Sequence, residues 1–211
     1  LRLGGDLRAG VGRLLRIRLM PPLAHMVVYI SVGLSGAVRL VKLDTKGLDY
    51  FGDTTADFWR SFLAAAVVAP LFFLYLVIRF VGSETDGSFP AYLVAQILAY
   101  AIAWLAFPLI MLYMAPVLQK EDKVVRYLVA YNWLSVIQNG VYLPVVMLGI
   151  TGTFAQGLSN SLAMIVLMWV LGMTLFVTRK ALEVPFGTAA GIVVMDLLLG
   201  VLIEVLTSRP G

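Results

Sequence analysis

One carboxylate, Asp196, lies inside a long apolar run that extends from Val184 to Val205. In a membrane helix over 186–206, Asp196 would be about 15 Å from the helix start, near the midplane of the bilayer. A carboxylate at that depth is costly, and it indicates a proton or cation site. The other interpretation is a structural acid that is protonated, hydrogen-bonded, or in contact with another subunit. We expect the side chain to point into a helix bundle or a partner, and not toward lipid.

Polar side chains with helical spacing occur in two other apolar runs, and they indicate surroundings for this acid. The stripe in the run 124–150 consists of Asn132, Ser135, Gln138, Asn139 and Tyr142. The stripe in the run 90–116 consists of Gln96, Tyr100 and Trp104. A spacing of three or four residues places such side chains on one helical face. The depths of Asn132, Ser135 and Tyr100 make these three the expected partners of Asp196. The two stripes predict either a polar cavity or hydrogen bonds that hold helices together.

Two further pairs of residues have spacing that suggests a role. Arg79 and Glu204 both fall near the same end of their apolar runs, where they would either form an ion pair or reach water separately. Gly187 and Gly191 form a GxxxG pair, which allows close packing of helix backbones.

The composition places these residues in a bilayer. Of the 211 residues, 61% are hydrophobic and 13% are charged, and the mean hydropathy is +0.93. A water-soluble domain of this size could not bury so much apolar surface, so a soluble enzyme is excluded, as are disordered and collagen-like chains. The chain has no cysteine and a single histidine, His25, which excludes disulfides, thiolate metal sites and a histidine-rich metal site. No catalytic motif is recognisable, so we expect no enzyme activity, no metal and no cofactor.

The apolar runs predict an all-α, polytopic membrane helical bundle. The runs are continuous and do not alternate, which favours helices over a barrel. A polar insert, residues 151–160, divides the longest uncharged stretch into two spans. We therefore predict five transmembrane helices, at about 58–81, 90–116, 124–150, 159–180 and 186–206.

The basic residues predict the orientation of this bundle. Nine of the sixteen Lys and Arg residues precede the first apolar run or lie at its start. The loops that follow alternate between loops without Lys or Arg and loops with them. By the positive-inside rule, the N-terminus is cytoplasmic and the C-terminus lies outside, as in a bacterial inner membrane. The arm with Arg8, Arg13, Arg16 and Arg18 is basic enough to lie on anionic lipid. These scattered arginines do not suggest nucleic-acid binding.

The segment 21–41 is apolar enough to resemble a sixth span. Its apolar residues recur on one helical face, and both of its flanks are basic. We therefore predict an amphipathic interfacial helix, with Ile30 and Leu34 facing lipid or helix ends. A spanning or re-entrant segment is the alternative. This divides the chain into a basic cytoplasmic and interfacial region, 1–57, and a five-helix transmembrane domain, 58–206.

A basic cytoplasmic N-terminal region followed by five spans resembles the YIP family of small membrane proteins. The resemblance is one of architecture over residues 58–206. The acidic-Leu-x-Gly-Pro signature of that family is absent, since the sequence around Pro70 reads Val68-Ala-Pro-Leu71. The segment Tyr131 to Gln138 is similar to uncharacterised proteobacterial membrane proteins.

Neither resemblance implies an activity. Short loops and few intramembrane charges favour a non-enzymatic scaffold or accessory subunit, in contact with other membrane protein subunits. The alternative is a small oligomeric transporter or an ion or proton pathway that uses Asp196.

Overall fold

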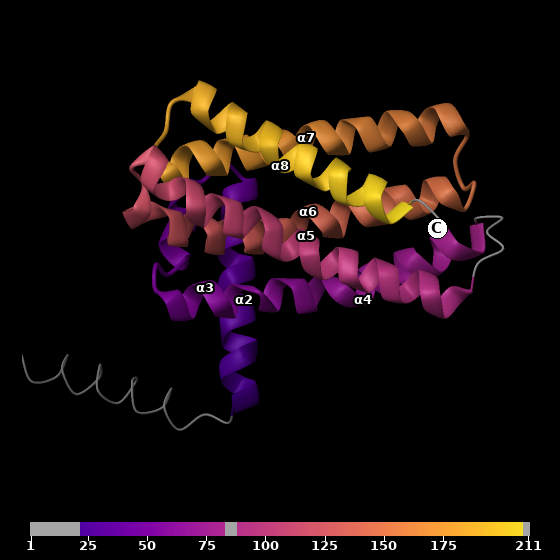
Figure 1. Ribbon diagram of the computed structural model, residues 1–211, viewed down its shortest axis with the longest axis horizontal. Coiled ribbons are helices and arrows are strands. Elements are labelled where there is room, and N and C mark those ends of the chain that lie inside the picture. Colours follow the sequence, from indigo (N-terminus) through magenta and orange to yellow (C-terminus); the bar gives the residue numbers. More distant parts are fainter. Residues whose placement is uncertain (1–21, 83–87, 209–211) are drawn as a thin grey trace, which may run out of the picture.

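A computed structural model describes residues 22–82 and 88–208 of the chain. Within this part the regular elements are helices, and the expected all-α membrane bundle is confirmed (Figure 1). The elements are α2 (Pro22–Val41), the 3-10 helix η1 (Thr45–Tyr50), α3 (Thr55–Ser61), α4 (Leu63–Gly82), α5 (Phe89–Leu118), α6 (Glu121–Ile150), α7 (Gln156–Leu182) and α8 (Phe186–Ser208). The arginine arm and the residues 83–87 lie outside the described residues, so the structure says nothing of the predicted contact with anionic lipid.

The five predicted spans correspond to α4 to α8, with boundaries within a few residues of those expected. The first span differs most, because its helix begins at Thr55 and is interrupted at Phe62. The short helix α3 begins at Thr54, whose side chain accepts a hydrogen bond from the Asp57 backbone N–H, while the Asp57 carboxylate accepts one from the Thr54 backbone. Such a capping box satisfies backbone donors that a helix start leaves unpaired.

The two ends of the bundle differ in charge. The basic end carries the start of α3, the turn between α5 and α6, and the turn between α7 and α8, with Lys120, Lys123, Arg126, Arg179 and Lys180. The C-terminal end carries the end of α4, the turn between α6 and α7, and the end of α8 (Figure 1). A helix of 30 residues such as α5 or α6 is about 45 Å long, which exceeds a hydrocarbon core of about 30 Å.

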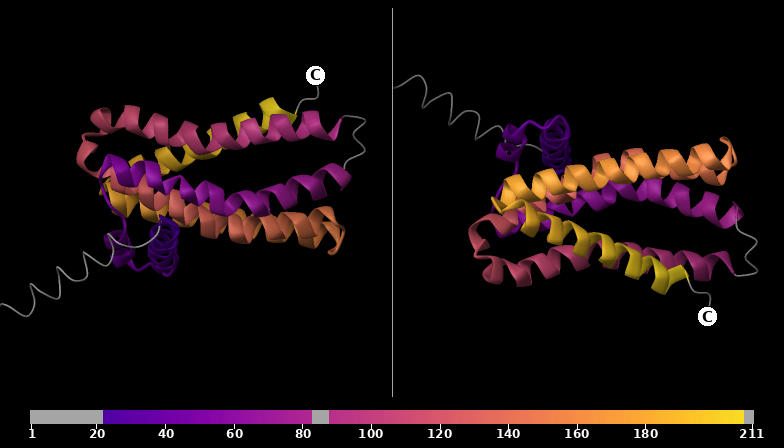
Figure 2. Two further views of the ribbon diagram at one scale, coloured as in Figure 1. Left: turned by 90° about the horizontal axis from the view of Figure 1, so that it is seen from below. Right: turned by 90° about the horizontal axis from the view of Figure 1, so that it is seen from above.

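Helix α2 runs across the bundle instead of along it (Figures 1 and 2). It is long and apolar enough to cross a membrane by itself. However, its axis is nearly perpendicular to the other long helices and lies on their basic half (Figure 1). If the long helices span the bilayer, α2 lies along the membrane surface, as the interfacial interpretation of 21–41 predicted.

The face of α2 that packs on the bundle is richer in small residues than expected. Gly33 and Ala37 are buried, and a Cβ atom on Gly33 would clash with the indole ring of Trp133 in α6, whereas the buried Gly36 packs on Tyr50 and Phe51. Ile30 and Leu34 also pack against the core, so they face the bundle. In contrast, other apolar residues of α2 are exposed to the surroundings, namely Met26, Val27 and Val38. The helix thus has two apolar surfaces, one for α6 and one for lipid.

The contact between Gly33 and Trp133 predicts a measurable cost of overpacking. Replacing Gly33 by alanine forces the buried Trp133 ring to move, and such overpacking costs about 1–3 kcal/mol. We expect Gly33→Ala to lower the free energy of unfolding by that amount in a detergent or denaturant titration. The matched control is Gly140→Ala in α6, because a Cβ there meets no atom within 4 Å. Equal stability of both variants would contradict the packing described.

Candidate functional site

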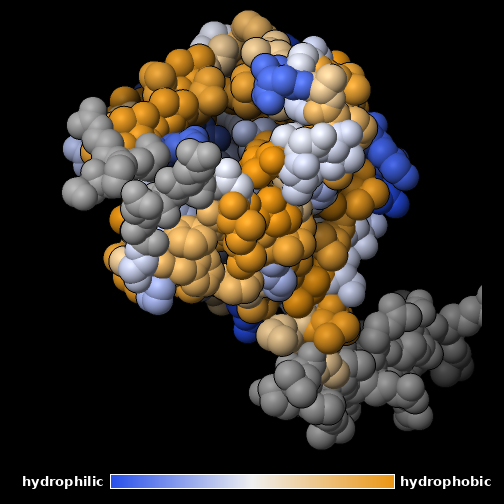
Figure 3. Space-filling view, turned by 90° about the vertical axis from the view of Figure 1, so that its right-hand side faces the viewer, coloured by the Kyte–Doolittle hydropathy of each residue, from blue (hydrophilic) through white to orange (hydrophobic). Residues whose placement is uncertain are grey.

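The long helices form two layers that separate toward the C-terminal end. One layer contains α5 and α8, and the other contains α4, α6 and α7 (Figure 2). The layers meet near the basic end and diverge toward the opposite end, as both views in Figure 2 show. Figure 3 looks onto the C-terminal end and shows a hollow between hydrophobic helices, with hydrophilic residues at its wall. The separation therefore produces an internal space that is open at one end.

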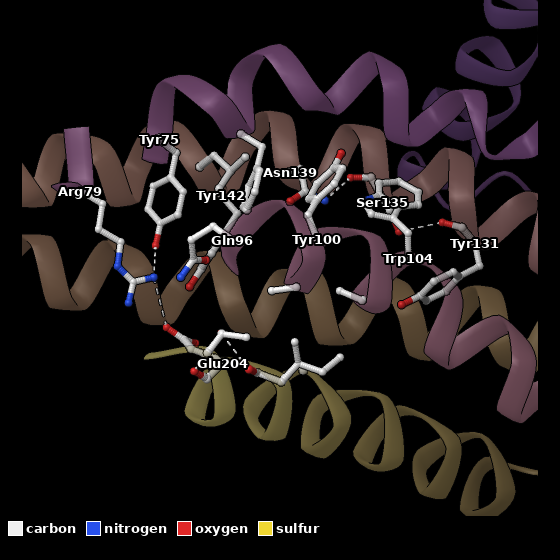
Figure 4. Close-up of a pocket in the computed structure, with 17 residues that line it drawn as sticks. Tyr75, Arg79, Gln96, Tyr100, Trp104, Tyr131, Ser135, Asn139, Tyr142 and Glu204 are labelled. Atoms are coloured by element: carbon white, nitrogen blue, oxygen red, sulfur yellow. Dashed lines mark hydrogen bonds and ion pairs between the residues drawn. The ribbon is translucent and has the colours of Figure 1, made fainter. Parts of the chain in front are cut away.

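A cavity of about 340 Å³ occupies the space between the layers. Its wall comes from α4, α5, α6 and α8, and Figure 4 shows the side chains pointing into a common space. Its aromatic, polar and charged lining residues are Phe72, Tyr75, Arg79, Gln96, Tyr100, Trp104, Tyr131, Ser135, Asn139, Tyr142, Glu204 and Thr207. A volume of this size is that of a small-molecule pocket.

An ion pair between the two layers lies near the mouth of this cavity. Arg79 Nη1 is 3.8 Å from Glu204 Oε1, and the same nitrogen donates a hydrogen bond of 3.0 Å to the Tyr75 hydroxyl (Figure 4). The pairing interpretation of Arg79 and Glu204 is therefore the one that the structure shows. The carboxylate of Glu204 is largely exposed, so the pair adds little stability. Its consequence is that the positive charge at the mouth has a negative partner.

Asp196 is oriented into the bundle, as expected, but its partner differs from those predicted. The Tyr131 hydroxyl on α6 lies 2.9 Å from both carboxylate oxygens of Asp196 on α8. Asn132 and Ser135 bond elsewhere, and the Tyr100 hydroxyl donates to the Ala65 carbonyl at 2.7 Å. Among the described residues, no Lys, Arg or His forms an ion pair with Asp196.

A second, smaller cavity adjoins the first along α6. It has a volume of about 220 Å³, and its wall comes from α6, α7 and the part of α8 that carries Asp196. The residues that line both cavities all come from one face of α6, namely Tyr131, Ser135, Asn139 and Tyr142. This face of α6 therefore borders both the larger cavity and the smaller cavity that contains the carboxylate.

The α6 stripe that lines the cavities is rotated relative to the predicted one. Asn132 is fully buried and donates to Ser61 Oγ at 2.7 Å, and it lines neither cavity, so the prediction of one shared face is wrong for this residue. Gln138 donates to the Val170 carbonyl and to Thr174 Oγ1, at the wall of the smaller cavity.

Tyr131 takes the place of Asn132 in the stripe, and its spacing could have indicated this, because it lies one turn before Ser135. The Tyr131 backbone carbonyl accepts a hydrogen bond of 2.9 Å from the Ser135 hydroxyl.

The α5 stripe lies in the wall of the larger cavity as a whole, since Gln96, Tyr100 and Trp104 all line it. The Tyr100 ring stacks on Phe72 at 4.5 Å between ring centroids, and its edge meets Trp104 at 6.0 Å. Both stripes therefore combine the two roles that the sequence left open. They hold neighbouring helices by hydrogen bonds or ring contacts, and they also line a cavity.

The cavity ends at a closed aromatic core toward the basic end. The Phe107 ring lies 4.5 Å from the Tyr131 ring, and the Tyr127 hydroxyl is 3.0 Å from Thr178 Oγ1. Phe107, Tyr127 and Thr178 are buried. These contacts join α5, α6 and α7, and they close the cavity on the side of Tyr131 that faces the basic end.

Ion pairs at the basic end fasten the same helices to their turns. Lys123 in α6 pairs with Glu183, which follows α7, and this hydrogen-bonded ammonium holds the pKa of Glu183 below its usual range. Arg126 pairs with Asp53 at 2.9 Å, which links α6 to the loop before α3.

In contrast, Gly187 and Gly191 face open space, since a Cβ on either would meet no atom within 4 Å. Packing of this pair against another chain stays a prediction.

The described residues contain no group of three or more His, Cys, Asp or Glu that could hold a metal ion. Comparisons of the chain with protein-family models, with curated proteins and with solved structures give no match. The resemblance to the YIP family therefore stays a prediction, and the two cavities are the features of the molecule that bear on its function.

The different environments of Asn132 and Asn139 predict different responses to the same substitution. Asn132→Ala removes a buried amide that bonds Ser61, and losing such a hydrogen bond costs about 1–3 kcal/mol. Asn139→Ala removes a half-buried cavity residue that bonds its own helix, so we expect little change in stability. Thermal unfolding in detergent checks the difference. A greater loss of stability for Asn139→Ala would contradict this assignment.

Proposed function

We propose that the chain is a small membrane transporter whose pathway runs through the cavity between the two helix layers. The observation that carries the proposal is a one-sided cavity that shares a face of α6 with a smaller cavity, which an ionisable acid, Asp196, lines. A cavity that is open at one end and closed by packed aromatic residues at the other has the form of one state of an alternating pathway. The proposal assigns no enzyme activity to the chain.

The accessory-subunit hypothesis receives less support from the same geometry. A scaffold needs helix surfaces for other subunits, and it has no need of an internal polar cavity of about 340 Å³. An acid such as Asp196 is costly deep inside a membrane protein, and a residue of this kind usually marks a solute or ion pathway. Contacts with further subunits, including a second copy, are compatible with transport.

The orientation of the transporter is part of the proposal. The positive-inside rule puts the basic end in the cytoplasm, so the cavity opens to the outside of the membrane, as in a bacterial inner membrane. Asp196 is 12 residues from the end of α8 at Ser208, which makes it about 18 Å deep from the outer end. The route of the solute then crosses half of the bilayer before it reaches the carboxylate.

The surroundings of Asp196 determine what its charge can do. The other titratable residues that line the smaller cavity are Tyr131 and Tyr142, both on α6, and α7 contributes none there. The charged residues of the larger cavity, Arg79 and Glu204, pair with each other at its mouth. Asp196 is therefore the ionisable group to which we assign a proton or cation on the pathway.

Accessibility of Ser135 from both sides of the membrane tests alternating access directly. The chain has no cysteine, so Ser135→Cys gives a single thiol in the wall shared by the two cavities. We expect a membrane-impermeant thiol reagent to label it from the outside and, at a slower rate, from the cytoplasmic side, because a transporter must open its site to each side in turn.

Two exposed positions provide the controls for sidedness. Thr153→Cys, in the turn between α6 and α7, should be labelled only from outside, and Asp122→Cys, at the start of α6, only from the cytoplasm. Labelling of these two controls from the same side would overturn the orientation. Labelling of Ser135→Cys from one side only would show a static cavity and contradict transport.

Flux through reconstituted vesicles tests the role of Asp196. Asp196→Asn keeps the size of the side chain and an oxygen that accepts the Tyr131 hydrogen bond, so we expect the fold to be retained. An internal pH-sensitive dye reports the proton flux into the vesicles. We expect the pH-dependent flux of the variant to fall to the level of protein-free vesicles. Asp49→Asn, in η1 and away from both cavities, is the matched control. Unchanged flux in Asp196→Asn would refute the assigned role.

A further inference from the structure

The charges around the deep part of the cavity select the sign of a ligand. Arg79 is the cationic residue that lines the larger cavity, and Glu204 already neutralises it at the mouth. Deeper in the bundle, the charged side chain is Asp196, which has no ion-pair partner among the described residues. Coulomb interactions are strong where water is excluded, so this region repels anions and attracts cations.

The Asp196 carboxylate also has unused capacity to accept hydrogen bonds. Tyr131 has one hydroxyl proton, so it donates to one of the two oxygens at a time, although both lie 2.9 Å away. An ionised carboxylate has about four lone-pair positions. A ligand with an ammonium group would supply the missing charge, and an N–H or a hydroxyl group on the same ligand would supply a further donor.

A bare metal ion does not fit this region. Hard cations such as Ca²⁺ take six or more oxygen ligands, usually with several carboxylates. The described residues contain no cluster of three or more His, Cys, Asp or Glu. The wall is instead aromatic, and a space of about 340 Å³ is far larger than a single ion requires.

The aromatic residues of the wall are the second feature that favours an organic cation. Phe72, Tyr100, Trp104 and Tyr131 line the larger cavity, and they come from three helices, α4, α5 and α6 (Figure 4). The faces of aromatic rings attract cations, and tryptophan does so most strongly. The acceptor bound to the Tyr131 hydroxyl is an anion, which makes the ring of Tyr131 richer in electrons.

We propose that the deep part of the cavity binds a small organic ammonium ion. The ammonium group lies against the α6 face shared by both cavities, with Asp196 as its counter-charge and the rings of Tyr131, Tyr100 and Trp104 around it. The apolar part of the ligand lies toward Ala99, Ala103 and Leu143. That an organic ammonium ion is the transported substrate rests on the proposed transport function, whereas its binding in the cavity does not.

Three compounds of nearly the same shape and different charge test this selectivity. Choline carries a positive charge, 3,3-dimethylbutan-1-ol is its neutral isostere, and 3,3-dimethylbutanoate carries a negative charge. Binding to the full chain in lipid nanodiscs is measured by calorimetry. We expect choline to bind about tenfold or more tightly than the alcohol, and the anion not to bind. Equal binding of the alcohol, preferential binding of the anion, or no binding of choline would overturn the proposal.

Two matched pairs of variants assign the binding residues. Trp104→Leu should weaken choline binding about tenfold, the effect expected of one cation–π contact. Trp59→Leu, an exposed ring outside the cavity, should leave it unchanged. Asp196→Asn should remove the preference for choline over the alcohol, whereas Asp49→Asn should keep it. Thermal unfolding of each variant reports whether it folds, and a folded Asp196→Asn protein that still prefers choline contradicts the site.

Uptake of labelled choline into vesicles separates this inference from the proposed function. Selective choline binding without uptake would leave the ammonium site standing and overturn transport. Uptake of the anion above the level of protein-free vesicles, without selectivity for choline, would support transport and overturn the ammonium site.

Discussion

The hydrogen bond from Tyr131 on α6 to Asp196 on α8 joins the two helix layers. In a bilayer, burying apolar surface between helices gains little, because lipid is as apolar as the side chains. Polar contacts therefore have a large influence on which helices stay together. Asp196 on α8 cannot face lipid without a severe penalty, so it turns toward α6. This one constraint holds α8 against the other layer and creates a polar wall for the cavity.

The basic end supplies the rigidity that this arrangement needs. Trp133 is buried beneath α2, where Gly33 leaves room for its ring, and Tyr29 meets the same ring edge-on at 5.8 Å. Asn132, one residue earlier, holds α6 to Ser61 at the end of α3. The buried side of α6 near the basic end is thus fixed by α2 and α3. Its opposite side remains free to line the cavities, which explains why neighbouring residues of one helix have such different roles.

The sequence was sufficient to predict the fold class and the approximate limits of the spans, because continuous apolar runs and the distribution of charge depend on the bilayer alone. It was not sufficient for the direction in which each α6 residue points. Asn132 and Asn139 differ by seven residues and share a face in an ideal helix, yet one is buried against α3 and the other lines the cavities.

Tyr131 was not among the predicted partners of Asp196, because its position in the sequence does not show which helix it faces. Only the position of α8 identifies it as that partner. The second apolar surface of α2 was hidden for a similar reason. Glycine and alanine contribute little to an amphipathic pattern, although Gly33 packs on Trp133 and Ala37 is fully buried.

The ion pairs at the two ends indicate how such a bundle could change state. Lys123–Glu183 and Arg126–Asp53 at the basic end involve exposed or partly exposed side chains, as does Arg79–Glu204 at the other end. Exposed pairs contribute about 1 kcal/mol or less, so exchanging them costs little. The larger barrier lies in the buried contacts around Phe107 and Tyr127, which close the cavity. A ligand that binds beside Tyr131 contacts the edge of this aromatic core, since the Tyr131 ring packs on Phe107. In the proposed transport function, Tyr131 is the side chain that would connect occupation of the cavity with opening of the basic end.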